Sequence, residues 1–283
     1  MTDAARAGDH GTLFVVATPI GNLGDITLRA VEVLRSVSVV AAEDTRVTRR
    51  LLSRYDITTP MLSYHAHSND RRTQELIARL ESGDDVALVT DAGTPLVSDP
   101  GEVLVGLWVE SGGTVVPIPG ASAVLAALVS SGIPAPRWSF EGFLPRKGRE
   151  RRERLARIAA DDRATVLYEA HGRTAATLRD LADLCGADRQ AAVCRELTKL
   201  HEEVRRGSLA ELATAFGDRS IKGEVAIVVA GASGGAAAAA DLDAGRRRVD
   251  TLVAEGVKRS TAARLVAEET GLPRRDLFAV EDD

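Results

Sequence analysis

A short polar loop in the first half of the chain carries residue types that bind small molecules. The loop DAGTP (91–95) directly follows the apolar, β-branched-rich segment 86–90. Such a segment is typical of a buried parallel strand, and the glycine after it lets the backbone approach a ligand closely. The loop closes with DPG (99–101), and helical spacing resumes over 102–111. A strand, a glycine loop and a helix form the unit that binds ligands at the carboxyl end of α/β sheets.

The same arrangement recurs on both sides of this loop. The strand-like segment 13–17 leads into TPIGNLGD (18–25), and the segment 114–118 leads into PGAS (119–122). One such loop alone is equally typical of an ordinary connection, but its repetition at several strand ends indicates a nucleotide-like pocket. Because the spacing G-x-G-x-x-G is absent, a nicotinamide oxidoreductase is the least favoured enzyme class.

Charged residues follow another strand-like segment, 38–42, which runs into EDTR (43–46). Two adjacent carboxylates and an arginine at a strand end suit acid–base chemistry. Asp44 is equally well explained as the N-cap of the helix expected over 47–52.

The elements that position these loops alternate between strand and helix throughout the first half. This alternation predicts an α/β fold with a parallel sheet and helices on both faces, over 12–131. The proline-rich break after residue 131 predicts a second α/β domain over 132–231. The run GASGGAAAAA (231–240) indicates a flexible linker, followed by a small helix-turn-helix-like domain over 241–283. Residues 1–11 have the composition of a disordered leader.

The amino-acid composition limits which class of protein this chain can be. The chain has 283 residues, 45% hydrophobic and 27% charged, with a formal net charge of −5, as in a soluble globular protein. Cys185 and Cys194 lie outside any disulfide or metal-ligand spacing, so no metal site is expected. The amino terminus has no signal pattern and no apolar run is long enough to cross a membrane, which predicts a cytoplasmic protein.

One segment is locally basic despite the negative net charge. Between 146 and 157 seven cationic residues accompany only Glu150 and Glu153. Each of these acids lies four residues before an arginine, so part of the segment is explained as a self-paired helix face. The excess charge at its start, beside Phe140 and Phe143, suits contact with RNA phosphates.

Eight loops, taken together and in order, resemble those of a known enzyme superfamily. They are TPIGNLGDIT (18–27), EDTR (43–46), DAGTPLVSDPG (91–101), PIPGAS (117–122), FEGFLPRKG (140–148), YEAHGR (168–173), CRELTK (194–199) and KGE (222–224). The set resembles the tetrapyrrole (corrin/porphyrin) methylases, and among them the branch that 2′-O-methylates a decoding-centre cytidine of 16S ribosomal RNA. The resemblance covers roughly residues 12–231, and the tail resembles the helical C-terminal domain of many members.

This resemblance implies two α/β domains with S-adenosylmethionine (SAM) in the cleft between them, and a homodimer. Matched position by position, the cofactor-binding residues are Pro19, Asp91, Ala92, Gly93, Thr94, Val97, Ala121, Ser122, Tyr168, Leu197 and Gly223. The implied partner is 16S rRNA within the small ribosomal subunit, without DNA or membrane binding.

Ribose methylation needs alignment of the 2′-oxygen and loss of its proton. Asp44, at a strand end on the pocket side, is the first candidate for this role and Glu169 the second. The residues expected to hold RNA phosphates are Arg46, Arg146, Lys147, Arg173 and Arg195.

Two other functions remain open from the sequence. A C-methyltransferase of the same superfamily acting on a tetrapyrrole precursor has no need of the basic segment or the C-terminal helices. An RNA-binding assembly factor without turnover would bind the cofactor and transfer no methyl group.

Overall fold

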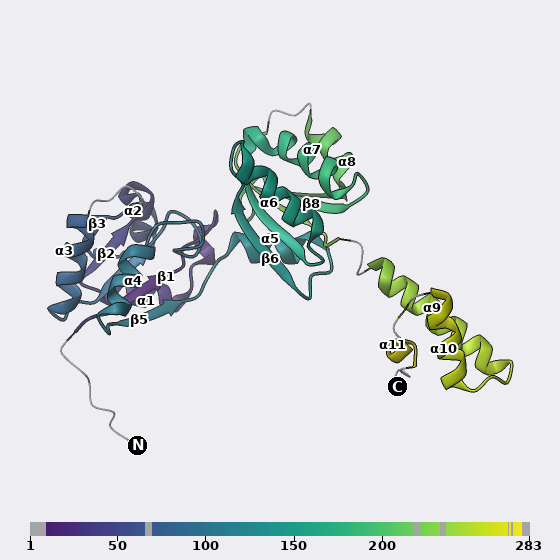
Figure 1. The fold of residues 1–283 in the computed structure, drawn as a ribbon. Coiled ribbons are helices and arrows are strands. Elements are labelled where there is room, and N and C mark those ends of the chain that lie inside the picture. Colours follow the sequence, from purple (N-terminus) through teal and green to yellow (C-terminus); the bar gives the residue numbers. More distant parts are fainter. Residues whose placement is uncertain are drawn as a thin grey trace, which may run out of the picture.

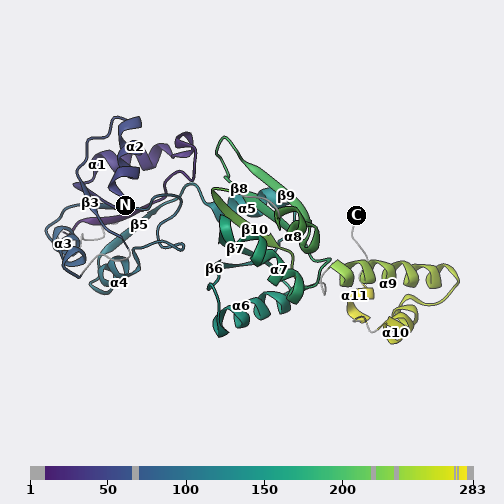
Figure 2. The same cartoon turned by 90° about the horizontal axis from the view of Figure 1, so that it is seen from above.

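The computed structural model describes residues 10–65, 70–217, 221–232, 236–270, 272 and 274–278. Within these residues the chain forms two five-stranded sheets and a separate group of C-terminal helices (Figure 1). Seen from above, the three parts follow one another in chain order (Figure 2). The expected leader lies outside the described residues up to residue 9.

The first sheet is parallel throughout, as the alternating pattern predicted. Its strands are β1 (Thr12–Val16), β2 (Val39–Ala42), β3 (Met61–Ser63), β4 (Val86–Val89) and β5 (Thr114–Ile118), in the order β3-β2-β4-β1-β5. Every residue of β2 and β4 is buried, which explains why these strands are apolar without alternation.

Helices cover both faces of this sheet because successive strand residues point to opposite sides. On one face α1 (Leu28–Ser36) and α2 (Thr45–Arg54) pack on residues such as Val40 and Val89. On the other face α3 (Asp70–Glu81) and α4 (Glu102–Glu110) pack on residues such as Val39 and Leu88. A short 3₁₀ turn (Leu23–Asp25) precedes α1.

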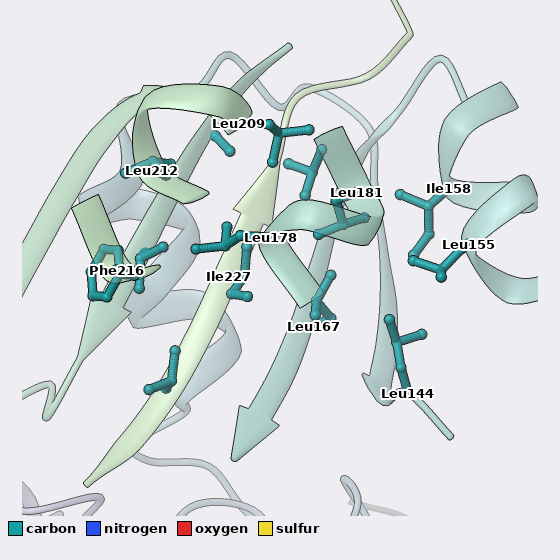
Figure 3. Close-up of a cluster of buried hydrophobic side chains, with 14 of the residues drawn as sticks. Leu144, Leu155, Ile158, Leu167, Leu178, Leu181, Leu209, Leu212, Phe216 and Ile227 are labelled. Atoms are coloured by element: carbon teal, nitrogen blue, oxygen red, sulfur yellow. The ribbon is translucent and has the colours of Figure 1, made fainter. Parts of the chain in front are cut away.

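The second sheet is mixed. It contains β6 (Trp138–Phe143), β7 (Ala164–Ala170), β8 (Gln190–Arg195), β9 (Glu203–Ser208) and β10 (Glu224–Val229), in the order β6-β7-β10-β8-β9. Only β6 and β7 are parallel to each other, and the other pairs are antiparallel. Helices α6 (Arg149–Ala160), α7 (Thr174–Cys185) and α8 (Leu209–Gly217) cover one face, where Leu178 and Ile227 belong to the core shown in Figure 3. A 3₁₀ turn (His171–Arg173) leads into α7.

The other face of the second sheet is covered by α5 (Ala123–Ser131), which follows the last strand of the first sheet. Val124 and Ala127 of α5 pack against residues such as Val166 and Val228, and both views place the helix with the second sheet (Figures 1 and 2). The packing therefore changes from the first sheet to the second at residues 119–122, before the proline-rich break. The domain boundaries at residues 131 and 231 stay predictions.

The C-terminal helices are α9 (Ala236–Ala254), α10 (Arg259–Thr270) and α11 (Arg274–Phe278), which share a small core around Val249 and Val266. Residues 236–240, expected in the linker, instead form the first turn of α9, since alanine has the highest helix propensity. Residues 233–235 of that linker lie outside the described residues. In the part of the chain that is described, no helix is long and apolar enough to cross a membrane.

Candidate active site

A cleft of about 300 Å³ lies between the two sheets, a volume at the lower end of the range for small-molecule sites. The first sheet contributes the segments after β1, β4 and β5, and the second contributes β6, β7, β8, β10 and the loops beside them. The lining residues are Ile20, Ala92, Gly93, Thr94, Val97, Ser98, Asp99, Ser122, Ala123, Phe143, Tyr168, Glu169, Ala170, His171, Cys194, Leu197, Gly223, Glu224, Val225 and Ala226.

Most of the predicted cofactor residues meet in this cleft, although they come from four loops and strand β7, spread over the chain. Those that line it are Ala92, Gly93, Thr94, Val97, Ser122, Tyr168, Leu197 and Gly223. Pro19, Asp91 and Ala121 are chain neighbours of lining residues and do not themselves line the cleft.

The loop after β4 is held in an unusual backbone conformation. Gly93 and Gly101 have φ angles of 81° and 133°, and the non-glycine residues Leu96 and Ser98 have 71° and 66°. A left-handed conformation costs an L-residue about 1–2 kcal/mol, and such strain concentrates at functional sites. Two backbone hydrogen bonds fix the loop, because Thr18 and Gly93 each donate to the other's carbonyl, at 2.8 and 3.0 Å.

The loop after β8 closes the cleft from the other side and is strained in the same way. Glu196 and Thr198 have φ angles of 51° and 66°. The Lys199 Nζ donates to Glu196 at 2.8 Å and to Glu224 at 3.0 Å, which ties this loop to the start of β10. A Cβ atom at Gly21 would lie 2.4 Å from the Lys199 Cγ, so the loop after β1 touches the second domain there.

Carboxylates gather where β2 and β4 end. The Asp91 backbone N–H donates to the Glu43 carboxylate at 3.3 Å, and the Asp44 N–H donates to the Asp91 carboxylate at 3.0 Å. Burial is the main cause that raises the pKa of both Glu43 and Asp91. Each carboxylate is therefore partly desolvated and also bonded to the neighbouring strand end.

Asp99 is the lining carboxylate with the strongest electrostatic perturbation. Burial first, and then the negative charge of Glu43, raise the pKa of Asp99 from 3.8 to about 7. Across the cleft, burial and then the charge of Asp99 raise the pKa of Tyr168 to about 12, so its hydroxyl is neutral at physiological pH. A cation in the cleft would relieve the repulsion among these carboxylates.

The two catalytic candidates both have partners within the protein. Asp44 is the N-cap of α2, accepting from the Arg46 backbone N–H at 2.8 Å, as the alternative explanation of this residue required. Hydrogen bonds from the Arg46 side chain and backbone lower the pKa of Asp44 to about 2. The Glu169 side chain is fully buried, and its carboxylate pairs with Arg173 at 2.8 Å and accepts from the Thr177 hydroxyl at 2.6 Å.

The cations expected on RNA fall into two groups. Arg173 and Arg195 are engaged inside the second domain, with Glu169 and Glu203 respectively. Arg46 is exposed and paired with Asp44, while Arg146 and Lys147 are exposed without an ion-pair partner among the described residues.

Sequence reasoning missed several residues of the cleft, of which Asp99 is the most informative. DPG (99–101) had the pattern of a turn that merely ends the loop, and nothing local marks Asp99 as desolvated. One sequence feature could have indicated a role for Asp99. It lies at the end of the long loop that follows a buried strand, and this loop turns back toward the cleft. Ser98, Ala123, His171 and Glu224 also line the cleft and were not among the predicted site residues.

Comparison with known proteins defines the class. The family model for tetrapyrrole (corrin/porphyrin) methylases matches residues 12–213. The fold is similar to uroporphyrin-III C-methyltransferase of Thermus thermophilus in complex with S-adenyl homocysteine, with TM-score 0.57 and 19% identity over 78% of this chain and 97% of that one. It is also similar to a cobalt precorrin-4 methyltransferase, with TM-score 0.59 and 17% identity over 81% and 98% of the two chains. The fold is that of the tetrapyrrole methylases.

Closer relatives define the group. Ribosomal RNA small subunit methyltransferase I of Synechocystis sp. is 49% identical over 95% of this chain and 96% of its own length. The protein of the same name from Micromonospora olivasterospora is 46% identical over 98% of this chain and 89% of its own. The chain therefore belongs to the tetrapyrrole methylase family and, within it, to the ribosomal RNA small subunit methyltransferase I group.

Because the pKa of Asp99 is raised in the folded protein, we predict that the free energy of unfolding depends on pH. The folded protein keeps a proton on Asp99 up to a pH of about 7, whereas the unfolded chain releases it near 3.8. Between these two pH values the folded state therefore binds more protons than the unfolded chain does. Because of this, Asp99 lowers the free energy of unfolding as pH rises. Asp99→Asn should therefore match the wild type near pH 4 and melt at a higher temperature above pH 7.

The control for this measurement is Asp161→Asn. Hydrogen bonds from Arg163 lower the pKa of Asp161 to about 2, so its loss should shift the melting temperature by a constant amount between pH 4 and 8. A difference between Asp99→Asn and wild type that does not grow with pH would contradict the assignment.

Proposed function

We propose that this protein transfers a methyl group from SAM to the ribose 2′-hydroxyl of a decoding-centre cytidine in 16S rRNA, within the small ribosomal subunit. The observation that carries the proposal is similarity along nearly the whole chain, C-terminal helices included, to proteins named ribosomal RNA small subunit methyltransferase I. The relatives of known fold named for tetrapyrrole substrates are below 25% identity and support the fold alone.

The residues of the cleft fit SAM in shape and charge. Gly93 and the small residues beside it leave room for a ligand against the backbone, and Tyr168 supplies an aromatic wall. Asp99 and Glu224 line the same cleft and suit a cationic ligand. When bound, SAM supplies a methyl group on a sulfonium that is already a good leaving group, which leaves alignment and proton removal to the protein.

Hydroxyl orientation is assigned to Asp44, with Glu169 as the second candidate. Asp44 follows β2 and its backbone N–H donates to Asp91, the chain neighbour of the cleft-lining Ala92, which supports a place for Asp44 near a substrate outside the cofactor. Its pKa of about 2 keeps it ionised, and so able to accept a hydrogen bond from a ribose hydroxyl. Arg146 and Lys147 are assigned to phosphates, which need positive charge and no particular base.

We also propose that the protein is a homodimer and that it acts in the cytoplasm. The apolar helices α4 and α5 expose several large side chains, among them Val103 on α4 and Val129 on α5. Exposed apolar surface of this kind is typical of protein interfaces, and a second copy of the chain is the proposed occupant.

The direct test is transfer of labelled methyl from SAM to small subunits isolated from cells that lack this gene. We expect label on the ribose of one decoding-centre cytidine, located by mapping the modified nucleotide. Label on a tetrapyrrole precursor and none on subunits would favour the C-methyltransferase, and SAM binding without any transfer would favour an assembly factor.

Loss of the Asp99 charge should weaken cofactor binding. In the wild type the Kd for SAM should fall as pH rises through about 7 and then level off, because Asp99 ionises over this interval. Asp99→Asn should raise the Kd at pH 8 roughly tenfold, as expected for a hydrogen bond to a charged group, and remove the pH dependence. Calorimetric titration measures the Kd for SAM and its pH dependence. Asp161→Asn is the control and should leave both unchanged. A wild-type Kd that does not change with pH would argue against the role of Asp99 in cofactor binding.

The Asp44→Asn variant separates catalysis from helix capping. Asparagine caps a helix about as well as aspartate, so the melting temperature should stay close to that of the wild type. Removal of the charge should lower kcat by about tenfold or more, the scale of a lost hydrogen bond to a charged group. An unchanged kcat at saturating subunits would leave Asp44 as a helix cap alone.

A further inference from the structure

An irregularity in β6 brings two phenylalanines to the same side of the second sheet. Phe140 pairs with Val166 and Phe143 pairs with Tyr168, so β6 advances three residues while β7 advances two. The extra residue is a β-bulge, which redirects side chains that strand alternation would place on opposite faces. As a result, both phenylalanine rings contact Tyr168, with centroid distances of 4.9 and 5.5 Å.

The bulge is held from both sides. Gly142 has a φ angle of 57°, and a Cβ atom there would lie 3.0 Å from the Ser98 Oγ of the loop after β4. Arg154, largely buried, donates to the Glu141 carboxylate at 2.9 Å and to the Phe143 carbonyl at 3.1 Å. The direction of the Phe143 side chain is therefore built into the fold.

Phe143 is exposed in spite of this support. Phe140 is half-buried within the apolar cluster beneath α5, whereas Phe143 lines the cleft and is 53% exposed. An aromatic ring with one side on Tyr168 and much of its surface open is costly to leave in water, and it offers a stacking surface.

Positive charge lies close to this ring along the chain. Arg146 and Lys147, three and four residues beyond Phe143, are both exposed, and neither has an ion-pair partner among the described residues. An open aromatic ring followed by free cations is the combination that single-stranded nucleic acids bind, through base stacking and phosphate contacts.

We propose that Phe143 is the stacking surface for the base of the target nucleotide, at the mouth of the cleft. The inference rests on the proposed function, because it places the RNA against the cofactor cleft. A base stacked on Phe143 is removed from its neighbours in the RNA, which brings its own ribose to the cleft entrance. Arg146 and Lys147 hold phosphates beside it.

The test compares Phe143→Leu with Phe143→Trp in methyl transfer to unmethylated small subunits. Loss of one base–aromatic stack corresponds to roughly a tenfold effect or more, so Phe143→Leu should raise the KM for subunits by that factor. Phe143→Trp should keep the KM within about threefold, because it retains a stacking face. The Kd for SAM, measured separately by calorimetry, should be unchanged in both variants.

Leu184→Ala is the matched control, since Leu184 is 50% exposed on α7 and does not line the cleft. Its KM should equal that of the wild type. An unchanged KM in Phe143→Leu, or a raised Kd for SAM, overturns the stacking role, the latter because the ring would then contact the cofactor. A wild type that transfers no methyl to subunits refutes the proposed function, and the stacking role with it.

Discussion

The site depends first on the pair of hydrogen bonds between Thr18 and Gly93. These two residues follow β1 and β4, neighbouring parallel strands whose connections run through separate helices. The antiparallel bridge between them joins the two loops where the parallel ladder has ended. The Thr18 hydroxyl adds a third bond, to the Thr90 carbonyl at 3.0 Å. With its start fixed in this way, the loop after β4 can hold its left-handed residues and bring Val97, Ser98 and Asp99 back over the cleft.

The second property of the cleft is the mutual repulsion of carboxylates in and beside it. Glu43, Asp91 and Asp99 are all partly desolvated, and beyond this burial the charges of Glu43 and Asp91 also raise the pKa of Asp99. Arg46, which is exposed, pairs with Asp44, and Lys199 pairs with Glu196 and Glu224. Positive charge on a bound ligand would relieve the repulsion at Asp99.

The basic segment shows how one stretch of sequence divides into several roles. The self-paired interpretation expected Glu153 to pair with Arg157, four residues later, whereas Glu153 pairs with Arg149, four residues earlier on the helix surface. Arg151 instead reaches Asp180 on α7, and Arg154 reaches the bulge in β6. These two arginines are structural residues of the second domain, whereas Arg146 and Lys147, which follow the cleft-lining Phe143 in the chain, are exposed.

By itself, the sequence determined the alternation of strands and helices, the parallel first sheet and the ligand loops at strand ends, because periodicity and glycine positions are local properties. It also determined the family, since the ordered loops carry that resemblance together. Tertiary structure decided what depends on distant neighbours. Local spacing showed neither the packing of α5 on the second sheet nor the desolvation of Asp99. Nor did it show which arginines pair with internal carboxylates, or that the bulge in β6 turns Phe143 toward the cleft. Burial, pairing and side-chain direction are set by residues far away in the chain, and these quantities determine charge and access in the cleft.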